Sequence, residues 1–301
     1  MHKPPTARLS ISILLVKGEA LNNHEKLIRE HFICPICRCP MEMTEDGKSV
    51  KCSGDNPKNK RHSFDFSADG YLSFGATGGD SKEAVAARRS FLRSTSHYKL
   101  AAEAIYHTVK RCVPDCKLLV DAGCGEGYYT SILSDLSECT VGFDLSKFAC
   151  LAGAKQAKRD EKQGLLFATA SVFELPLADG CADAVTNIFA PCAEEEYKRI
   201  LRDGGYLFVV GAGKDHLMGL KRVMYEDVYE NGPRADLPKN MEQVDRVISH
   251  YTINISEKEN IAALFSMTPY YWRTSEADKQ KLASLDSLET EIEFEINVYK
   301  K

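Results

Sequence analysis

The chain has 301 residues, of which 44% are hydrophobic and 27% charged, and its formal net charge is −4 at pH 7. This composition excludes a disordered chain and suits one large folded domain with a smaller one. The slightly negative charge gives no global signature of nucleic-acid binding, so any such role must depend on a local patch of basic residues.

The 11 cysteines are an odd number and several lie in apolar segments, which indicates buried free thiols and not a framework of disulfides. Free thiols are typical of reducing compartments, so we expect a cytoplasmic protein. The early apolar run Ile11–Val16 is too short for the core of a signal peptide or for a membrane span. No membrane partner is therefore expected.

Four segments are expected along the chain. Residues 1–30 suggest no fold, 31–75 form a zinc-binding domain, 76–112 form a linker and helical segment, and 113–301 form the main domain.

The zinc prediction depends on four residues: Cys34, Cys37, Cys52 and His62. Three thiolates and one imidazole make a tetrahedral Cys3His set, and a segment this small needs a metal because it lacks an apolar core of its own. The gap between Cys52 and His62 is longer than usual and would form a looped insertion. Cys39 and His31 are alternative ligands, and isolated buried cysteines with a redox pair are the alternative interpretation.

Residues 63–74 alternate aromatic and polar side chains and predict strands that complete a small sheet. A Gly-rich linker follows at 75–80, then a helix at 81–93 and a second helix that ends near Cys112. The first helix carries Arg88-Arg89, which suits either a solvated face or a contact to phosphate or carboxylate.

The main domain predicts strands that alternate with helices, near 118–123, 140–145, 165–170, 182–189 and 204–211. This alternation indicates a parallel sheet with right-handed crossovers. Two later segments, 246–255 and 291–299, predict an antiparallel edge, and Ser256-Glu-Lys-Glu259 predicts a capped helix start between them. The sequence therefore predicts an α/β fold with the seven-stranded, Rossmann-like architecture of S-adenosylmethionine-dependent methyltransferases.

The first strand of this domain turns into a helix through the stretch Asp121-Ala-Gly-Cys-Gly-Glu-Gly-Tyr-Tyr-Thr130. Gly123, Gly125 and Gly127 allow a sharp turn and the close approach of a ligand. Tyr128 stands where a dinucleotide fingerprint requires its last glycine, so NAD and FAD are disfavoured. S-adenosylmethionine is the alternative ligand.

Three polar residues complete the predicted cofactor site. Asp144 ends the second strand, where a carboxylate can accept both ribose hydroxyls, although it could instead sit at a helix N-terminus. Ser171 follows the third strand and is either a contact to the adenine edge or a turn residue. Asp121 either buttresses the loop or meets the methionine ammonium group.

The stretch Asn187-Ile-Phe-Ala-Pro191 follows the fourth strand, where methyltransferases that act on base nitrogens place a substrate-facing loop. Phe189 could stack on a base, or it could be a buried aromatic at a strand end. Methylation of guanine N1 requires removal of a proton from that nitrogen. No residue is identified as the general base that would accept this proton.

Six motifs, taken in order, resemble the bacterial 23S ribosomal RNA guanine-N1-methyltransferases that carry an N-terminal zinc finger, over about residues 32–300. They are Cys34-Pro-Ile-Cys37 with Cys52 and His62, Ala87-Arg-Arg-Ser-Phe-Leu92 with His97-Tyr98, the loop Asp121–Thr130, Phe189-Ala-Pro-Cys192, His216-Leu-Met-Gly-Leu-Lys221 and Met267-Thr-Pro-Tyr-Tyr-Trp-Arg273. Residues 1–30 have no counterpart in the family pattern, and the Cys52–His62 spacing is longer than the family's.

The resemblance implies S-adenosylmethionine as methyl donor, a 23S rRNA hairpin as substrate, and a zinc module that helps to recognise RNA. It further implies that the cofactor pocket is lined by Tyr98, Gly127, Tyr128 and His216. Basic residues would hold RNA phosphates: Lys58, Lys60, Arg61, Arg88 and Arg89. The alternatives are a small-molecule methyltransferase with a structural zinc finger and a non-catalytic binding module, and a homodimer is left open.

Overall fold

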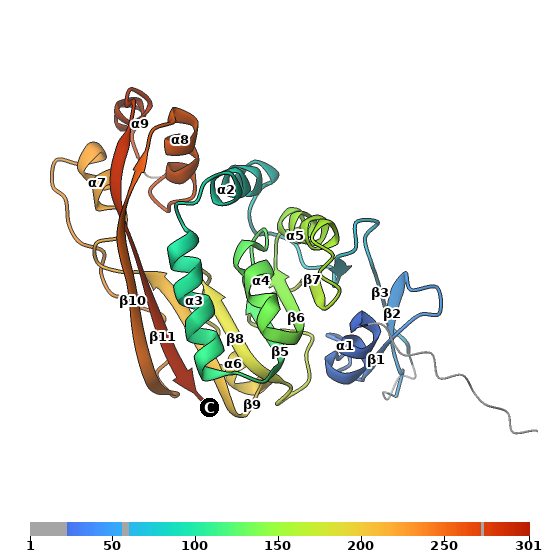
Figure 1. Cartoon of the computed structure of the whole chain (residues 1–301). Helices are drawn as coiled ribbons and strands as arrows, with labels where there is room; N and C mark the ends of the chain where they lie inside the picture. The colour runs from blue at the N-terminus through green and yellow to red at the C-terminus, as the bar shows by residue number, and fades with distance from the viewer. Residues whose placement is uncertain (1–22, 56–59, 272–273) are drawn as a thin grey trace, which may run out of the picture.

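The computed structural model of the protein describes residues 23–55, 60–271 and 274–301, and its largest element is an eight-stranded sheet (Figure 1). In spatial order, the strands are β10 (Glu242–Ile255), β11 (Leu288–Lys300), β9 (Leu201–Ala212), β8 (Ala182–Ile188), β5 (Cys116–Ala122), β6 (Ser137–Asp144), β7 (Leu165–Thr169) and β4 (Leu72–Ser73). The strands from β9 to β4 are parallel, whereas β11 is antiparallel to both β9 and β10. The predicted α/β, Rossmann-like fold is confirmed.

The order of the strands places two of the predicted loops side by side. The chain proceeds from β5 to β6 and β7 on one side and then returns to place β8 on the other side of β5. Ligands of open α/β sheets bind at the carboxyl ends of strands where such a reversal occurs. The glycine loop follows β5 and the Asn187–Pro191 stretch follows β8, so both lie at this position.

Helices cover both faces of the sheet. They are α1 (Asn23–His31), α2 (Lys82–Ser94), α3 (Lys99–Cys112), α4 (Tyr128–Leu133), α5 (Lys147–Arg159), α6 (Glu194–Ile200), α7 (Met218–Met224), α8 (Lys258–Ser266) and α9 (Glu276–Ala283), with a 3-10 turn at Ser134–Leu136. Adjacent residues of β5 point to opposite faces of the sheet. Leu118 belongs to the core that includes residues of α6 and α1, whereas Leu119 belongs to the core that includes residues of α3. Among the described residues, no helix is long and apolar enough to cross a membrane.

Helix α2 lies across the end of the sheet at which the parallel strands terminate (Figure 1). The hydroxyl of Ser81 caps it by accepting the N–H of Ala84 at 3.2 Å. The segment before it is held by the hydroxyl of Ser146, which donates to the carbonyl of Asp80 at 2.7 Å just beyond β6. The helix expected at 81–93 therefore covers the predicted cofactor loop.

The N-terminal module is packed on the sheet and is not a separate finger. It comprises α1 and a three-stranded sheet of β1 (Met41–Met43), β2 (Ser49–Cys52) and β3 (Ser63–Asp65). The connection from β7 to β8, residues 170–181, contains no helix, and Phe32 packs there in one core with Leu166 of β7. The N–H of Ile33 also donates to the carbonyl of Pro176 at 3.1 Å. The module thus takes the place of a missing crossover helix, and α1 runs across the expected boundary at residue 30.

The expectation that residues 63–74 all belong to the small sheet is wrong for the end of the segment. Only β3 pairs with β2, whereas β4 pairs in parallel with β7 through Leu72 and Ala168. A turn at Gly70, whose φ is +96°, separates the two strands, and Leu72 becomes completely buried on the large sheet. The main sheet therefore gains an eighth strand at its edge.

The helix between the last two strands begins later than its sequence predicts. The N-cap residue of α8 is Glu257, and its side chain makes no capping hydrogen bond. The capping box expected from Ser256 and Glu259 is therefore wrong, although a helix does form.

Candidate cofactor site and zinc site

The three glycines of the predicted loop all have a left-handed backbone. Their φ angles are +84° at Gly123, +54° at Gly125 and +81° at Gly127. A Cβ at Gly123 would lie 2.3 Å from the Cβ of Ala190, and one at Gly127 would lie 2.6 Å from Cζ of Phe167. Both glycines are therefore required by close packing as well as by φ.

Gly125 differs from its neighbours because its missing side chain faces a less crowded region. The nearest atom to a Cβ there is Nη1 of Arg88, at 3.6 Å. The N–H of Gly125 donates to Oδ2 of Asp144 at 3.0 Å, and the N–H of Ser146 donates to Oδ1 at 2.7 Å. Burial raises the pKa of Asp144, while these two N–H groups oppose that shift. The loop and the carboxylate thus form one unit at the carboxyl edge of the sheet.

Asp121 is held inside the fold. It is almost completely buried, and its two carboxylate oxygens accept the hydroxyls of Thr130 at 2.5 Å and Thr186 at 2.8 Å. Burial raises the pKa of this carboxyl to about 6. The arrangement favours the buttressing role of Asp121 over contact with a ligand.

An aromatic cluster stands next to this loop, and it brings Tyr98 and His216 together. Their ring centroids lie 6.3 Å apart, and both rings stand edge-on to Phe294, at 5.4 and 5.5 Å. Phe189 packs on Phe294 at 4.8 Å but remains 48% exposed, with a φ of +55° that is strained for a bulky residue. Phe189 is therefore not the buried aromatic that one interpretation of the sequence allowed.

The protonation of His216 follows from its surroundings. Burial, and then the charge of Lys221, lower the pKa of His216 to about 3, so the ring is neutral at pH 7. The backbone N–H of Glu293 lies 3.2 Å from Nδ1, and because an N–H can only donate, Nδ1 accepts this bond. The ring proton of the neutral form is therefore on Nε2, which makes this atom a hydrogen-bond donor.

Two other predicted residues lie nearer the periphery. The ring of Tyr128 faces the guanidinium of Arg93 on α2, 5.9 Å from its centroid, and lines a groove beside α2. The hydroxyl of Ser171 accepts the N–H of Phe173 at 3.3 Å, which is the local bond of a turn residue. Ser171 still stands at the same edge as Asp144, because β6 and β7 pair there.

Sequence reasoning missed the clamp that fixes the Asn187–Pro191 stretch. Arg234 donates to Oδ1 of Asn187 at 2.8 Å and to the carbonyl of Ala190, and its Nε donates to Asp236 at 2.6 Å. Asp236 in turn accepts the N–H of Cys192 at 2.8 Å. The clamp comes from the segment between α7 and β10, and neither a motif nor a periodicity marks it.

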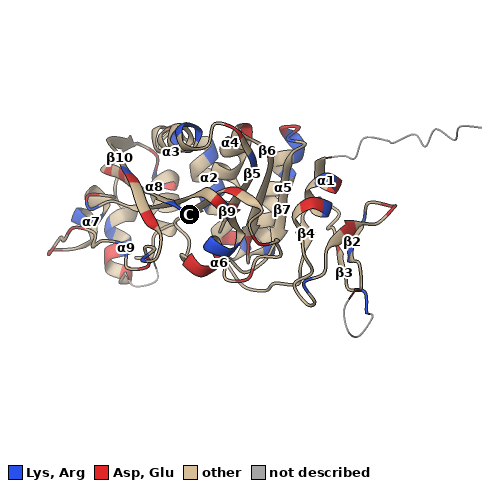
Figure 2. Cartoon of the chain, turned by 90° about the horizontal axis from the view of Figure 1, so that it is seen from below, with Lys and Arg blue, Asp and Glu red and all other residues tan. Residues whose placement is uncertain are grey.

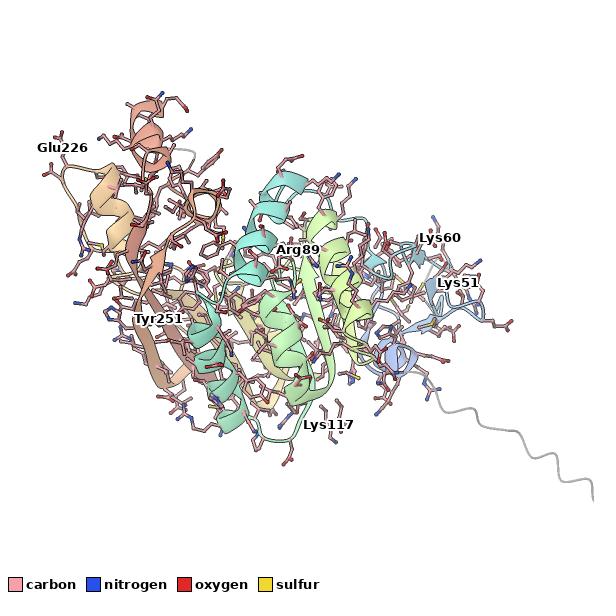
Figure 3. All side chains as sticks on the ribbon, turned by 45° about the horizontal axis from the view of Figure 1, so that its top comes forward. Lys51, Lys60, Arg89, Lys117, Glu226 and Tyr251 are labelled. Carbon is pink, nitrogen blue, oxygen red and sulfur yellow. The ribbon has the colours of Figure 1, made fainter. Side chains whose placement is uncertain are left out.

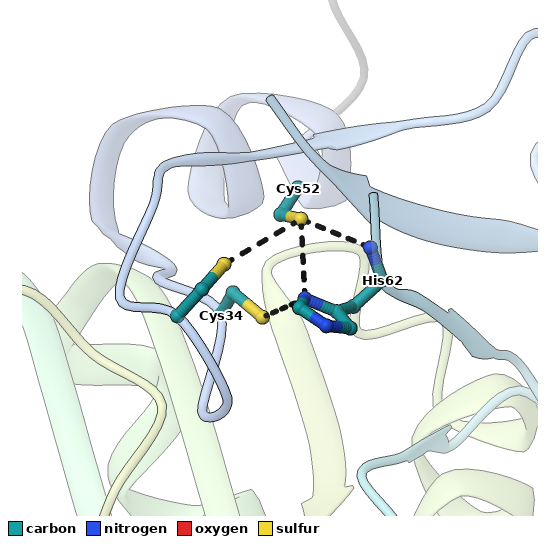
Figure 4. A group of neighbouring side chains, drawn as sticks. Cys34, Cys52 and His62 are labelled. Carbon is teal, nitrogen blue, oxygen red and sulfur yellow. Dashed lines mark hydrogen bonds between the residues drawn. The ribbon is translucent and has the colours of Figure 1, made fainter. Parts of the chain in front are cut away.

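The four predicted zinc ligands form one cluster. Sγ of Cys34, Cys37 and Cys52 and a ring nitrogen of His62 all lie within 4.8 Å of one another (Figure 4). Cys34 Sγ and Cys52 Sγ lie 3.5 and 3.7 Å from His62 Nδ1, and Cys37 Sγ lies 3.7 Å from Cys52 Sγ. Zinc bonds of about 2.3 Å to sulfur and 2.0 to 2.1 Å to nitrogen give tetrahedron edges of about 3.8 and 3.6 Å. The donor set therefore fits a tetrahedral zinc ion.

The alternative ligands lie outside this cluster. Cys39 is buried, and its Sγ donates to the carbonyl of Cys37 at 3.7 Å. Nε2 of His31 lies 3.8 Å from the carboxylate of Glu30. The long Cys52–His62 gap is the loop between β2 and β3, of which residues 56–59 lie outside the described part of the chain.

Comparisons with known proteins agree with this geometry. Residues 120–209 match the family model described as a methyltransferase domain. Over 264 residues, the chain is 30% identical to the 23S rRNA (guanine(748)-N(1))-methyltransferase of Streptomyces fradiae. The alignment covers 82% of this chain and 88% of that protein.

Two further relatives carry provisional names for guanine-N1 methylation of 23S rRNA. One, from Micromonospora griseorubida, is 30% identical over 82% of this chain and 88% of its own length. The other, YxjB of Bacillus subtilis, is 25% identical over 90% of this chain and 97% of its own length. With the Rossmann-like sheet, the glycine loop and the Cys3His cluster, these matches show that the chain is an S-adenosylmethionine-dependent methyltransferase of the 23S rRNA (guanine-N1)-methyltransferase family.

Proposed function

We propose that the protein transfers a methyl group from S-adenosylmethionine to N1 of a guanine in a 23S rRNA hairpin. The observation that carries the proposal is the exposed ring of Phe189, which packs on His216 at the edge that holds the glycine loop, with Tyr98 on the same histidine. An exposed aromatic at a strained strand end suits stacking on an extruded base. The name of the Streptomyces fradiae relative, guanine(748)-N(1)-methyltransferase, supports guanine N1 as the acceptor.

The described residues fit S-adenosylmethionine. Asp144 keeps free lone pairs on both oxygens and would accept the ribose hydroxyls, while Gly125 leaves room for the cofactor to approach the loop. Tyr98 and His216 would line the methionine end, with the Nε2–H of His216 as a donor. Gly127 and Tyr128 remain cofactor-pocket residues by family resemblance, and Ser171 is the proposed contact to the adenine edge.

The cofactor supplies an activated methyl group on a sulfonium, so the protein's main task is to place the acceptor nitrogen in line with it. Phe189 would hold the base by stacking, and the Arg234 clamp would fix the backbone that carries Phe189. The stretch is thereby preorganised, because Asn187 and Arg234 are already bonded before substrate arrives.

The Cys3His cluster would hold a structural zinc ion, and the module around it would help to bind RNA. Lys51 and Lys60 lie on this module (Figure 3), and Arg61 precedes β3. Lys58 lies outside the described residues. Charges of both signs are interspersed over the rest of the molecule (Figure 2), so the contact to RNA must be local.

Labelled S-adenosylmethionine tests the proposal when it is incubated with the protein and unmodified 23S rRNA. We expect label in 23S rRNA and none in 16S rRNA. Label found only in a small metabolite would establish a small-molecule methyltransferase, and cofactor binding without transfer to any acceptor would favour a binding module.

A further inference from the structure

A basic groove lies beside the cofactor loop, with Tyr128 on its wall. It has a volume of about 740 Å³ and runs between α2, the start of α3, the start of α4 and α5. Three cations, Arg89, Arg93 and Lys99, line it together with the ring of Tyr128, and the lining found among the described residues contains no aspartate or glutamate. Figure 3 shows Arg89 at the contact between α2 and α5.

The arginines of the groove lie on a different side of α2 from the residue that faces the glycine loop. With 3.6 residues per turn, Arg89 and Arg93 share one side of α2, and Arg88 points about 100° away from Arg89. Arg88 is the residue that faces Gly125, and it pairs with Asp80 at 2.5 Å. A ligand in the groove and a cofactor over Gly125 would thus contact different sides of α2.

The cations in the groove are only partly neutralised. Arg89 donates to the carbonyl of Ala152 at 3.2 Å and to Oε1 of Gln156 at 2.5 Å, and in the described chain it has no carboxylate within 4.0 Å. Arg93 donates from Nε to Glu126 at 3.1 Å, and Nη2 of Arg93 and Oε1 of Glu126 are both buried without a hydrogen-bond partner among the described residues. An anion in the groove would accept from N–H groups of Arg89 that do not bond Ala152 or Gln156.

Arg89 lies among other charged groups. Burial lowers the pKa of Arg89, and the positive charges of Arg93 and Arg159 lower it further, against the opposing effects of Glu126 and Asp160. Arg159 belongs to the last turn of α5, which also carries Lys158.

We propose that this groove binds the sugar-phosphate backbone of the RNA substrate, next to the base that is methylated. The proposal rests on the proposed function. Arginine forks match phosphate oxygens, and Lys99, whose Nζ lies 3.7 Å from Glu103, adds an exposed charge. RNA bound in the groove would hold its hairpin beside α2, which covers the cofactor loop.

The test compares Lys99→Gln with a matched control, Lys110→Gln, in the full-length protein. Both lysines are exposed and lie on α3, but only Lys99 lines the groove. Affinity for an unmodified 23S rRNA transcript is measured by filter binding at several salt concentrations. We expect Lys99→Gln to reduce the slope of log K against log salt by about 0.7 to 0.9 and Lys110→Gln to leave it unchanged. Arg89→Gln, checked for folding by thermal melting, should lower RNA affinity at an unchanged affinity for S-adenosylhomocysteine.

Three results would overturn the proposal. If wild type binds and methylates the transcript but Lys99→Gln and Lys110→Gln have the same slope, the groove does not contact RNA and the proposed function stands. If Arg89→Gln weakens S-adenosylhomocysteine binding and not RNA binding, the groove serves the cofactor. If wild type neither binds nor methylates the transcript, the proposed function fails as well.

Discussion

Cys52 and His62 face each other just beyond the paired residues of β2 and β3, although they are far apart for two ligands of one knuckle. The N–H of Cys52 donates to the carbonyl of His62 at 3.0 Å, and the N–H of His62 donates to Sγ of Cys52 at 3.1 Å. A hairpin brings its two ends together whatever the length of its loop, at a cost that grows only slowly with that length. The unusual spacing is therefore compatible with a complete Cys3His site.

The first prediction concerns the metal. We expect the purified protein to contain one zinc ion per chain and His62→Ala to lose most of it. The melting temperature should fall as well, because the free energy of structural zinc binding, about 10 kcal/mol or more, is coupled to folding. Metal analysis and thermal melting with and without a chelator measure both effects.

Cys39→Ser is the matched control for the zinc prediction, since Cys39 lies in the same turn but outside the cluster. It should retain zinc at the wild-type level. Loss of zinc from Cys39→Ser together with retention by His62→Ala would show that the ligand set is wrong.

The second prediction concerns the glycine loop. Gly123→Ala must both adopt a φ of +84° and relieve a 2.3 Å contact with Ala190, so we expect weaker S-adenosylhomocysteine binding and a loss of stability. The left-handed backbone alone costs about 1 to 2 kcal/mol. Gly70→Ala, with a φ of +96° and no atom within 4 Å, isolates that backbone cost. Denaturant unfolding that finds the two variants equally stable would argue against the close contact.

The third prediction concerns the ribose. Asp144→Asn removes a charged acceptor and places an amide against two N–H donors, so affinity for S-adenosylhomocysteine should fall about 10-fold to 100-fold, the equivalent of about 1.5 to 3 kcal/mol. Calorimetry measures the change, with the exposed Asp160→Asn as control. An affinity within twofold of wild type would remove Asp144 from the cofactor site.

The fourth prediction concerns pH. The pKa of His216 is about 3 in the folded chain, below its ordinary value of 6.5. Between pH 3 and pH 6.5, His216 is therefore protonated in the unfolded chain and neutral in the folded chain. The contribution of His216 is therefore fully present above pH 6.5 and is lost as the pH falls, by about 2 kcal/mol between pH 6.5 and pH 5. Urea unfolding of wild type and His216→Gln should show the variant losing less stability over this range. Equal losses would mean that His216 is exposed to protons in the folded state.

The strands of the main sheet were predictable because each is a short apolar run. The helices between them instead repeat their apolar residues with the spacing of a helix. β4 was not, since a two-residue strand has no period and is defined only by its pairing with β7. α1 was not predicted either. Its apolar face is small, because only Leu27 and Ile28 are buried against the rest of the module. Short elements whose partners are distant in the chain leave too little local signal.

The candidate site shows the same division. The glycine loop and the end of β6 are each marked by a few consecutive residues. Gly125 and Asp144 could therefore be assigned to one cofactor site from the sequence alone. The contact of Arg93 with Glu126 and the clamp of Arg234 on Asn187 join segments more than 30 residues apart. Such contacts depend on how α2 and the segment after α7 pack, which no local pattern in the sequence encodes.

The central claim, transfer of a methyl group to guanine N1 in 23S rRNA, is tested most directly by identifying the modified nucleoside. Unmodified 23S rRNA is treated with the protein and S-adenosylmethionine, digested to nucleosides and analysed by mass spectrometry, and the position is mapped by reverse transcription. We predict 1-methylguanosine at a single hairpin guanine, with a stop in reverse transcription because N1 lies on the pairing edge of the base. A methyl group on another atom or another nucleoside, or no modification by zinc-loaded protein that binds S-adenosylmethionine, would contradict the claim.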